Sequence, residues 1–213
     1  MSFVPETSVL IAYALACAIL FITPGPDMSL FLAKTISGGR RSGIAAMLGA
    51  TIGCVVHTLL AAIGLSALLA ASTTAFLIVK IVGAVYLLWL AVDAIRSGSA
   101  LNVKVGEPSR EPFLRTLLLG AGVNLTNPKV VLFFVTFLPQ FVRAGDPDAA
   151  GKLVFLGLFY VVFTLPFAIL MILGAEKLIG FLKGRKRVLR AIDWTFAGVF
   201  GYFAVHILAT QGR

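Results

Sequence analysis

The chain has 213 residues, of which 59% are hydrophobic and 13% are charged, and its formal net charge at pH 7 is +9. Soluble domains carry about 25% charged residues, so the composition excludes a water-soluble globular protein. The basic residues lie in short segments between long apolar runs, and this arrangement is a membrane-topology signal rather than a nucleic-acid-binding surface.

Six apolar runs are each long enough to cross the roughly 30 Å hydrocarbon core of a bilayer, which takes about 20 helical residues. The first is expected to be a retained helix rather than a signal peptide, because residues 1–8 contain Glu6 and no basic residue. The sequence therefore predicts an all-α polytopic membrane protein with one transmembrane domain over residues 1–213. In chain order the predicted spans cover about residues 8–33, 43–71, 74–95, 114–138, 153–175 and 191–210.

The distribution of Lys and Arg among the connections predicts the orientation. Thirteen lie in the first, third and fifth connections, whereas three lie in the fourth connection and the carboxy-terminal tail. The positive-inside rule places the richer side in the cytoplasm, so both termini are expected outside. Lys80, near the outer end of the third span, is expected to extend its ammonium group to the interface.

The connection at about residues 97–113 is the longest and most polar, and it divides the chain into halves of three spans, at about 8–96 and 114–210. Because each half has an odd number of spans, the halves have opposite orientation, and a duplication would make them an inverted repeat. The segment ITPGP at residues 22–26 corresponds to LTNPK at residues 125–129. We therefore expect two inverted three-helix repeats.

Both of these segments lie near the middle of their spans, where proline costs about 3 kcal/mol in a helix interior. The backbone groups that such a break frees must face protein or a water-filled cavity. An isolated proline kink is the alternative, but two breaks at one depth favour a substrate site between broken helices 1 and 4. The predicted substrate-binding residues are Thr23, Pro24, Gly25, Pro26, Asp27, Asn124, Thr126, Asn127, Pro128 and Lys129.

Asp27 and Lys129 directly follow these prolines, and each costs about 2.5–3.5 kcal/mol at a helix centre. They are expected to face each other or a shared cavity, with a static ion pair as the alternative. His57, in the second span, is either a hydrogen-bonded core histidine or a proton relay. Asp27 and His57 are therefore the candidates for proton coupling.

Cysteine and glycine positions complete the pattern. Cys17 and Cys54 lie in different apolar runs and belong to no CxxC or Cys/His cluster, so we expect neither a metal site nor a cofactor. Glycines in the second span are expected to allow close helix packing, and these are Gly43, Gly49 and Gly53.

Several motifs together resemble the lysine exporter and homoserine/threonine resistance (LysE/RhtB) family, in order and over nearly the whole chain. They are TPGPDM at 23–28, GGRRSGI at 38–44, GATIG at 49–53, GAVYLLWLA at 83–91, NLTNPK at 124–129 and FLPQF at 137–141. The resemblance implies a bacterial inner-membrane exporter of amino acids that is driven by the proton gradient, with both proline motifs lining the pathway. Overall, this sequence resembles the family branch that exports neutral amino acids more than the branch that exports basic amino acids. Family members carry Asn or Asp at the position of Asp27, so the resemblance alone does not assign proton coupling to that residue.

The sequence therefore predicts a secondary active exporter of small neutral amino acids, such as threonine or homoserine, that works by proton-coupled alternating access. It is expected not to be an enzyme, and its partners are the amino acid, protons and membrane lipids, with no nucleic acid; a homo-oligomer is left open. A metal or inorganic-ion transporter of related architecture is the alternative, but it would need more carboxylates, cysteines or histidines at depth. A membrane redox conductor would need cysteines beside the breaks, and an intramembrane enzyme would need a nucleophile and a base.

Overall fold

The computed structural model describes residues 4–97, 111–143, 146–182 and 185–211, and every element in these ranges is a helix. The all-α prediction is therefore confirmed for this part of the chain. Most of the connection at 97–113 lies outside the described residues, so the repeat and domain boundaries stay predictions. The elements are α1 (Thr7–Ile22), α2 (Pro26–Ala71), α3 (Thr73–Ser97), α4 (Phe113–Thr126), α5 (Pro128–Leu132), the π-helical η1 (Phe133–Phe137), the 3-10 helix η2 (Leu138–Phe141), α6 (Ala149–Leu173), α7 (Ala175–Leu182) and α8 (Lys186–Gln211).

Four helices in the described ranges are long and apolar enough to cross a membrane, namely α2, α3, α6 and α8. The chain from α4 through η2 adds a fifth if this bent pair, which turns by 54° at its break, is one span. Helix α1 is apolar, but its 16 residues reach only about 24 Å. Six spans therefore require α1 and the first part of α2 to act as one interrupted span, and that count stays a prediction.

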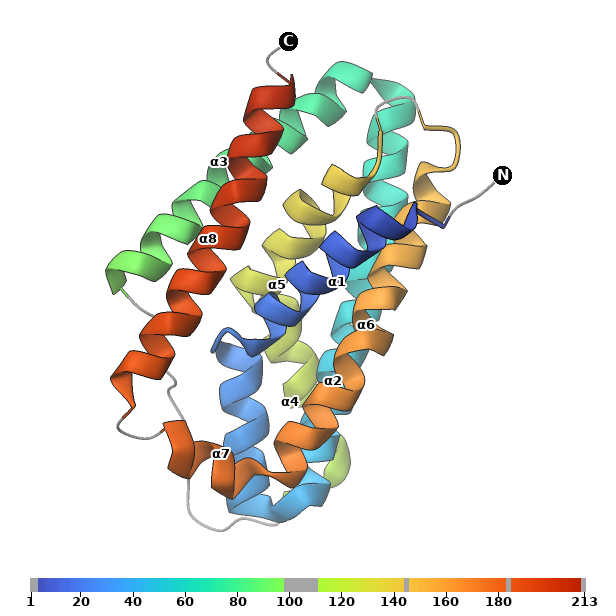
Figure 1. The fold of residues 1–213 in the computed structure, drawn as a ribbon. Helices are drawn as coiled ribbons and strands as arrows, with labels where there is room; N and C mark the ends of the chain where they lie inside the picture. The colour runs from blue at the N-terminus through green and yellow to red at the C-terminus, as the bar shows by residue number, and fades with distance from the viewer. Residues whose placement is uncertain (1–3, 98–110, 144–145, 183–184, 212–213) are drawn as a thin grey trace.

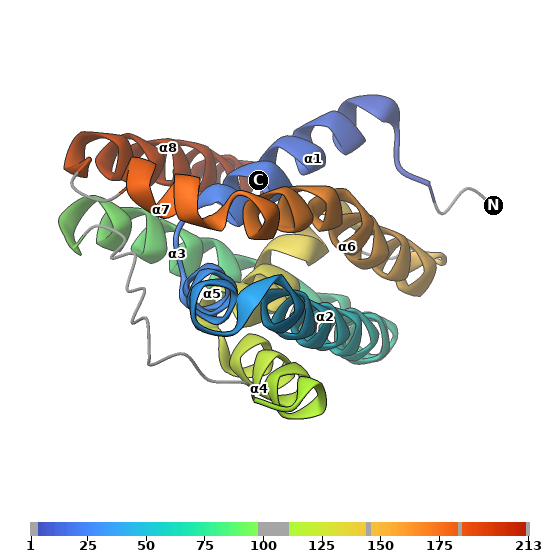
Figure 2. The ribbon, with the colours of Figure 1, turned by 90° about the horizontal axis from the view of Figure 1, so that it is seen from below.

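The helices form a bundle in which the two interrupted segments meet at the centre. Figure 1 shows α1 ending and α2 beginning at mid-height, and α4 giving way to α5 at a similar height. In the end-on view, α1 and α4 lie on opposite edges of the bundle and α2 lies between them (Figure 2). Thr23 and Asn127, the residues that precede Pro24 and Pro128, are buried, so the backbone groups freed at each break can find partners within the protein.

Two of the basic segments of the described chain lie at one end of the bundle. Arg40 and Arg41 follow the sharp turn of α2, and Lys177 lies in α7, at the lower end in Figure 1. The turn between α2 and α3 and the end of α8 lie at the upper end. This arrangement agrees with the predicted grouping of the connections, while the assignment of the lower end to the cytoplasm stays a prediction.

The first connection is a tight reversal within α2 rather than a loop. Gly39 takes φ 78° and ψ 176°, a combination that is essentially restricted to glycine because a Cβ atom would clash with the backbone. Residues on both sides of Gly39 are helical, so Lys34 lies within the helix. The helix thus continues past the predicted end of the first span near residue 33, and the bounds of that span stay a prediction.

The fourth span departs from a regular helix beyond its proline break. In η1 the Leu138 N–H donates to Phe133 O, five residues earlier, and Pro139, which follows, has no N–H to continue the α-helical pattern. The aromatic rings of this wide turn pack on α1, because Tyr13 stacks with Phe133 and Phe137 at centroid distances of 6.0 and 6.4 Å. This packing fixes α1 against the segment that follows the break between α4 and α5.

Helices α2 and α4 cross with their backbones in contact. A Cβ atom on Gly49 would collide with Leu117 O, and one on Gly120 would collide with Ala46 O. The close packing predicted for the second span is thus confirmed, since Gly53 also abuts α4 and Gly43 abuts Thr35 and Ile172. Small residues at such crossings are typical of membrane helices.

Lys80 is held by the protein at the end of another segment. It is only 6% exposed, and its Nζ donates to Val142 O at 3.2 Å. This carbonyl lies at the end of the irregular segment formed by η1 and η2, which the sequence does not predict. The expectation that Lys80 reaches the interface stays a prediction.

Substitution of Gly39 by alanine tests the reversal in α2. We expect Gly39→Ala to destabilise the protein by about 1–3 kcal/mol, because alanine is strained at this φ and ψ, and to lower its melting temperature by about 2–12 °C. Gly64→Ala is the matched control: Gly64 lies in the same helix with nothing within 4 Å of a built Cβ atom, so alanine there should be neutral or stabilising. Thermal unfolding of the purified proteins measures both, and equal effects would contradict the role of Gly39.

Candidate functional site

The first break separates α1 from α2. Pro24 and Pro26 have no backbone N–H, and each disfavours a helical conformation of the residue before it. Thr23 accordingly takes φ −65° and ψ 121°, and Gly25 takes φ −169° and ψ −176°. In a continuous helix the N–H of residue 24 would bond to Leu20 O, so the proline leaves that carbonyl without its helical donor.

The second break separates α4 from α5 and has the same backbone form. Asn127 precedes Pro128 and takes φ −70° and ψ 109°, close to the values of Thr23. Pro128 cannot donate to Asn124 O, which accepts the Asn127 N–H at 3.1 Å instead. The Asn127 Oδ1 then accepts the N–H of Lys129 at 3.1 Å and so caps the start of α5.

Lys129 extends from the second break into the first. Its Nζ donates to Leu20 O at 2.8 Å and to Thr23 O at 2.6 Å, which are carbonyls at the broken end of α1. Gly25 makes room for this contact, because a Cβ atom there would lie 3.3 Å from Nζ. The positive charge of Lys129 therefore lies at the carboxy-terminal end of a helix, which carries partial negative charge.

Asp27 makes the opposite connection, from the first break to the second. Its Oδ2 accepts a hydrogen bond from Asn124 Nδ2 at 2.8 Å. Its Oδ1 is buried and has no hydrogen-bond partner among the described residues. Asp27 and Lys129 form no ion pair within 4.0 Å, but both line the same cavity. The shared cavity that the sequence predicts is thus present, and a static ion pair between them is not.

Asn124 is held from several sides, which fixes the amide that contacts Asp27. Gly53 has no side chain, and a Cβ atom there would collide with the Asn124 Oδ1. Cys54 Sγ lies 3.5 Å from Asn124 Nδ2. His57 Nε2 lies 3.5 Å from Asn124 O, the carbonyl that Pro128 leaves without its helical donor, and the imidazole stacks on Phe134 at 5.5 Å.

The cavity between the breaks has a volume of about 60 Å³, which is room for a few water molecules. One part of its wall is polar and includes Asp27, Thr51, Asn124, Lys129, Tyr160 and Thr164. The remaining wall is mainly apolar and includes Met28, Phe31, Met47, Leu165 and Ala168. The wall of this small cavity therefore contains both charged and hydrophobic side chains.

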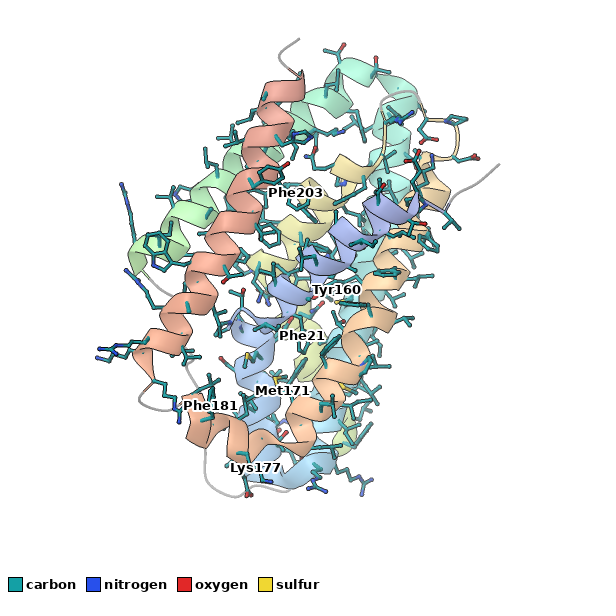
Figure 3. The ribbon with its side chains drawn as sticks, in the orientation of Figure 1. Phe21, Tyr160, Met171, Lys177, Phe181 and Phe203 are labelled. Carbon is teal, nitrogen blue, oxygen red and sulfur yellow. The ribbon has the colours of Figure 1, made fainter. Side chains whose placement is uncertain are left out.

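A larger apolar groove of about 560 Å³ adjoins the cavity. It lies between the end of α1 and helices α6, α7 and α8, and Phe21 and Met28 line both spaces. Figure 3 shows Phe21 and Tyr160 at mid-height and Met171 and Phe181, which line the groove, nearer the lower end. Phe21 and Met28 are thus the side chains that separate the cavity from the groove.

The predicted site residues do not all reach the cavity. Pro24 lines the neighbouring groove, and Pro26 and Pro128 are exposed, so the prolines act through the backbone. Thr126 is exposed, and its Oγ1 bonds to Gly122 O of its own helix at 2.8 Å. Those predicted residues that do line the cavity are Gly25, Asp27, Asn124 and Lys129.

Other cavity residues were not predicted from the sequence. Thr51, Tyr160 and Thr164 come from α2 and α6 and have no local signal that separates them from core residues. The carbonyl of Leu20 had such a signal, because a proline four residues later removes its helical donor. Within the described residues, no three His, Cys, Asp or Glu side chains gather in a way that could hold a metal ion.

Comparison with known proteins identifies similar chains. The sequence model of the LysE type translocator family matches residues 18–211. A homoserine/homoserine lactone efflux protein of Salmonella typhimurium is 29% identical over 89% of this chain and 90% of its own. A leucine efflux protein of Klebsiella pneumoniae is 27% identical over 94% of this chain and 95% of its own. No solved structure matches the chain.

Substitution of Gly53 tests whether its missing side chain positions Asn124. We expect Gly53→Ala to displace the Asn124 amide, weaken its bond to Asp27 and destabilise the protein by about 1–3 kcal/mol, which lowers the melting temperature by about 2–12 °C. Gly122→Ala in α4 is the control, since nothing lies within 4 Å of a Cβ atom built there. Thermal unfolding measures both variants, and an unchanged melting temperature for Gly53→Ala would contradict this packing role.

Proposed function

The chain belongs to the LysE type translocator family, and we propose that it exports small neutral amino acids, such as threonine or homoserine, in exchange for protons. The observation that carries this proposal is the pair of charged side chains, Asp27 and Lys129, that line one cavity between two broken helices. An amino acid is a zwitterion, and one group of each sign on opposite parts of a site suits its ammonium and carboxylate groups. The efflux functions of the relatives also support it.

The proposed topology has six spans in one domain, with α1 and the part of α2 before Gly39 as the first interrupted span and α4 to η2 as the second such span. The two halves, at about residues 8–96 and 114–210, would form inverted three-span repeats. The similar backbone angles at Thr23 and Asn127 support that symmetry. The distribution of basic residues supports an inner-membrane protein with both termini outside.

The contacts between the two breaks support transport by alternating access. The cavity that they border is narrow, at about 60 Å³, and in the proposed cycle this conformation is the closed one. Substrate can enter or leave only when elements carrying the two breaks move apart, first on the cytoplasmic side and then on the other. Contacts between the breaks, such as that between Asp27 and Asn124, therefore have to change during each cycle.

Asp27 is the proposed site of proton exchange. Its Oδ1 is buried without a partner in the described residues, and an unpaired buried carboxylate oxygen is costly unless a proton or a cation satisfies it. Competition between a proton and the substrate for this carboxylate would give antiport directly. His57 remains the second candidate, but its contact is with Asn124 O at 3.5 Å, which suits a positioning role at the second break.

Neutralising either charged residue should impair export. We expect Asp27→Asn and Lys129→Ala each to lower proton-driven threonine efflux by about 10- to 100-fold, because each removes a charge-assisted contact worth roughly 1.5–3 kcal/mol. The measurement is efflux of labelled threonine and homoserine from proteoliposomes with an imposed proton gradient. Lys152→Ala is the control, because Lys152 pairs with Asp146 in the connection before α6, away from the cavity. Wild-type efflux rates in both Asp27→Asn and Lys129→Ala would contradict the assignment of these two residues to the transport site.

The ion pair between Lys34 and Glu111 offers a test of opening on the proposed cytoplasmic side. Lys34 Nζ lies 2.9 Å from Glu111 Oε2 and joins α2, before its reversal, to the chain entering α4. The hydrogen bond from Lys34 holds the pKa of Glu111 below its ordinary value. The pair therefore contributes fully above that ordinary value, and its contribution is lost as pH falls through the lowered pKa.

Removal of this pair should favour the cytoplasm-open state. We expect Glu111→Gln to raise the labelling rate of a Thr51→Cys reporter from the cytoplasmic side by about two- to fivefold, since partly exposed pairs contribute up to about 1 kcal/mol. Both proteins would carry Cys17→Ala and Cys54→Ala, and a membrane-impermeant thiol reagent would be applied to inverted vesicles. Glu176→Gln, which removes another carboxylate near the same end, is the control. An unchanged rate in Glu111→Gln would show that the pair does not hold that side closed.

A further inference from the structure

The broken end of α1 forms a cage of backbone carbonyls around an ammonium group. Leu20 O has lost its helical donor because residue 24 is proline, and Thr23 O lies beyond the last regular turn. Both accept hydrogen bonds from Lys129 Nζ, at 2.8 and 2.6 Å. These two carbonyl oxygens are polar groups of the first break to which the proposed transport cycle assigns no role.

The two carbonyls of the cage and the Asp27 carboxylate are alternative partners for a positively charged group in the cavity. Lys129 satisfies the two carbonyls, yet it forms no ion pair with Asp27 within 4.0 Å, and the Asp27 Oδ1 stays buried without a partner among the described residues. Both the lysine and the aspartate line the one small cavity. The site thus offers more acceptors for a cation than its own ammonium group fills.

We propose that the Leu20 and Thr23 carbonyls form an alkylammonium-binding site, which Lys129 fills in this closed conformation and which the α-ammonium group of the substrate fills when Lys129 withdraws. The assignment of the substrate rests on the proposed export of amino acids. Lys129 then pairs with the substrate carboxylate, while the substrate ammonium contacts the cage and Asp27. The Lys129 ammonium group thus occupies, in the absence of substrate, the site that the substrate ammonium group occupies after loading.

Charge balance supports this exchange. With Asp27 ionised, the cavity contains one positive and one negative side chain, and a zwitterion adds equal charges of both signs, so the loaded site is neutral. A second ammonium group, as on a lysine substrate, would add a buried charge without a partner. The long flexible stem of a lysine side chain allows its ammonium group to move between the carbonyls and a carboxylate.

Chemical rescue of Lys129→Ala tests the cage without any transport assay. Truncation to alanine removes a fragment equivalent to n-propylammonium, so added n-propylammonium chloride should refill the space. We expect the melting temperature of this variant to rise by about 3–6 °C at ten times the dissociation constant. Equal concentrations of n-propanol or sodium chloride should have no such effect, because neither provides an N–H donor with positive charge.

Two further variants establish that the response comes from this site. Lys129→Met carries an uncharged side chain only one atom shorter than that of lysine, which fills most of the space, so n-propylammonium should not stabilise it. Lys80→Ala also truncates a buried lysine that donates to a backbone carbonyl, Val142 O at 3.2 Å, but Lys80 does not line the cavity, so its response should be at least threefold smaller. Equal stabilisation of all three variants, or none in Lys129→Ala, would overturn the proposal.

The proposed binding of the substrate ammonium group is tested with two threonine analogues, each of which lacks one of the two charged groups. In Lys129→Ala, 1-amino-2-propanol, which is threonine without its carboxylate, should raise the melting temperature, whereas 3-hydroxybutyrate, which is threonine without its ammonium group, should not. Stabilisation by 3-hydroxybutyrate and not by 1-amino-2-propanol would overturn the assignment of the cage to the substrate ammonium.

Failure of the cage and failure of the proposed function give different results. If the wild type exports no amino acid but Lys129→Ala still binds n-propylammonium, the cage stands and the proposed function fails. If the wild type exports amino acids but Lys129→Ala binds no amine, the proposed function stands and the cage fails.

If Lys129→Ala is not recovered as folded protein, the melting temperatures of Lys129→Arg and Lys129→Met test the proposal instead. Arginine keeps a positive charge and several N–H donors for the two carbonyls, so its melting temperature should stay nearer to that of the wild type than the melting temperature of the methionine variant. The double variant Asp27→Asn/Lys129→Met should recover part of the loss, because it removes the carboxylate that has no cation. A methionine variant as stable as the wild type would overturn the proposal.

Discussion

The structure depends on backbone carbonyls that proline leaves without donors inside a membrane-spanning bundle. Pro24 and Pro128 each remove the N–H that would satisfy a carbonyl one turn earlier, and hydrocarbon offers no replacement. The first break obtains its donor from the other half of the chain, because Lys129 donates to Leu20 O. At the second break, Asn124 O accepts the Asn127 N–H, and His57 Nε2 of the first half lies 3.5 Å away. The requirement for hydrogen bonds therefore brings the two breaks together around a polar cavity.

Glycine residues allow the two breaks to approach each other closely. Gly25 lets the Lys129 ammonium approach the backbone of the first break, and Gly53 leaves room for the Asn124 amide on α2. At the crossing of α2 and α4, Gly49 and Gly120 bring the two backbones into contact. Without a strong hydrophobic drive between helices in lipid, such close packing is a main source of stability, and here the same contacts set the position of the groups that line the cavity.

Transport and stability place opposite demands on these contacts. The bonds from Lys129 to α1 and from Asn124 to Asp27 hold the cavity closed at about 60 Å³. A transporter has to break and remake them, so each must be replaced by a contact of similar strength in the open state. A zwitterionic substrate can supply such replacements, since it brings an ammonium donor and a carboxylate acceptor of its own. Binding and opening are then coupled through the same few atoms.

The sequence alone determined the helical class, most of the apolar segments, the two breaks and the charged residues beside them, because proline chemistry and hydrophobic length are local properties. It did not determine which side chains face inward: Asn124 lines the cavity whereas Thr126, two residues later, is exposed. The burial of Lys80, the π-helical turn at Phe133–Phe137 and the inclusion of Tyr160 in the cavity were likewise decided by tertiary structure. In a helix that is apolar on every side, periodicity does not mark the inner face, so only packing against neighbouring helices decides it.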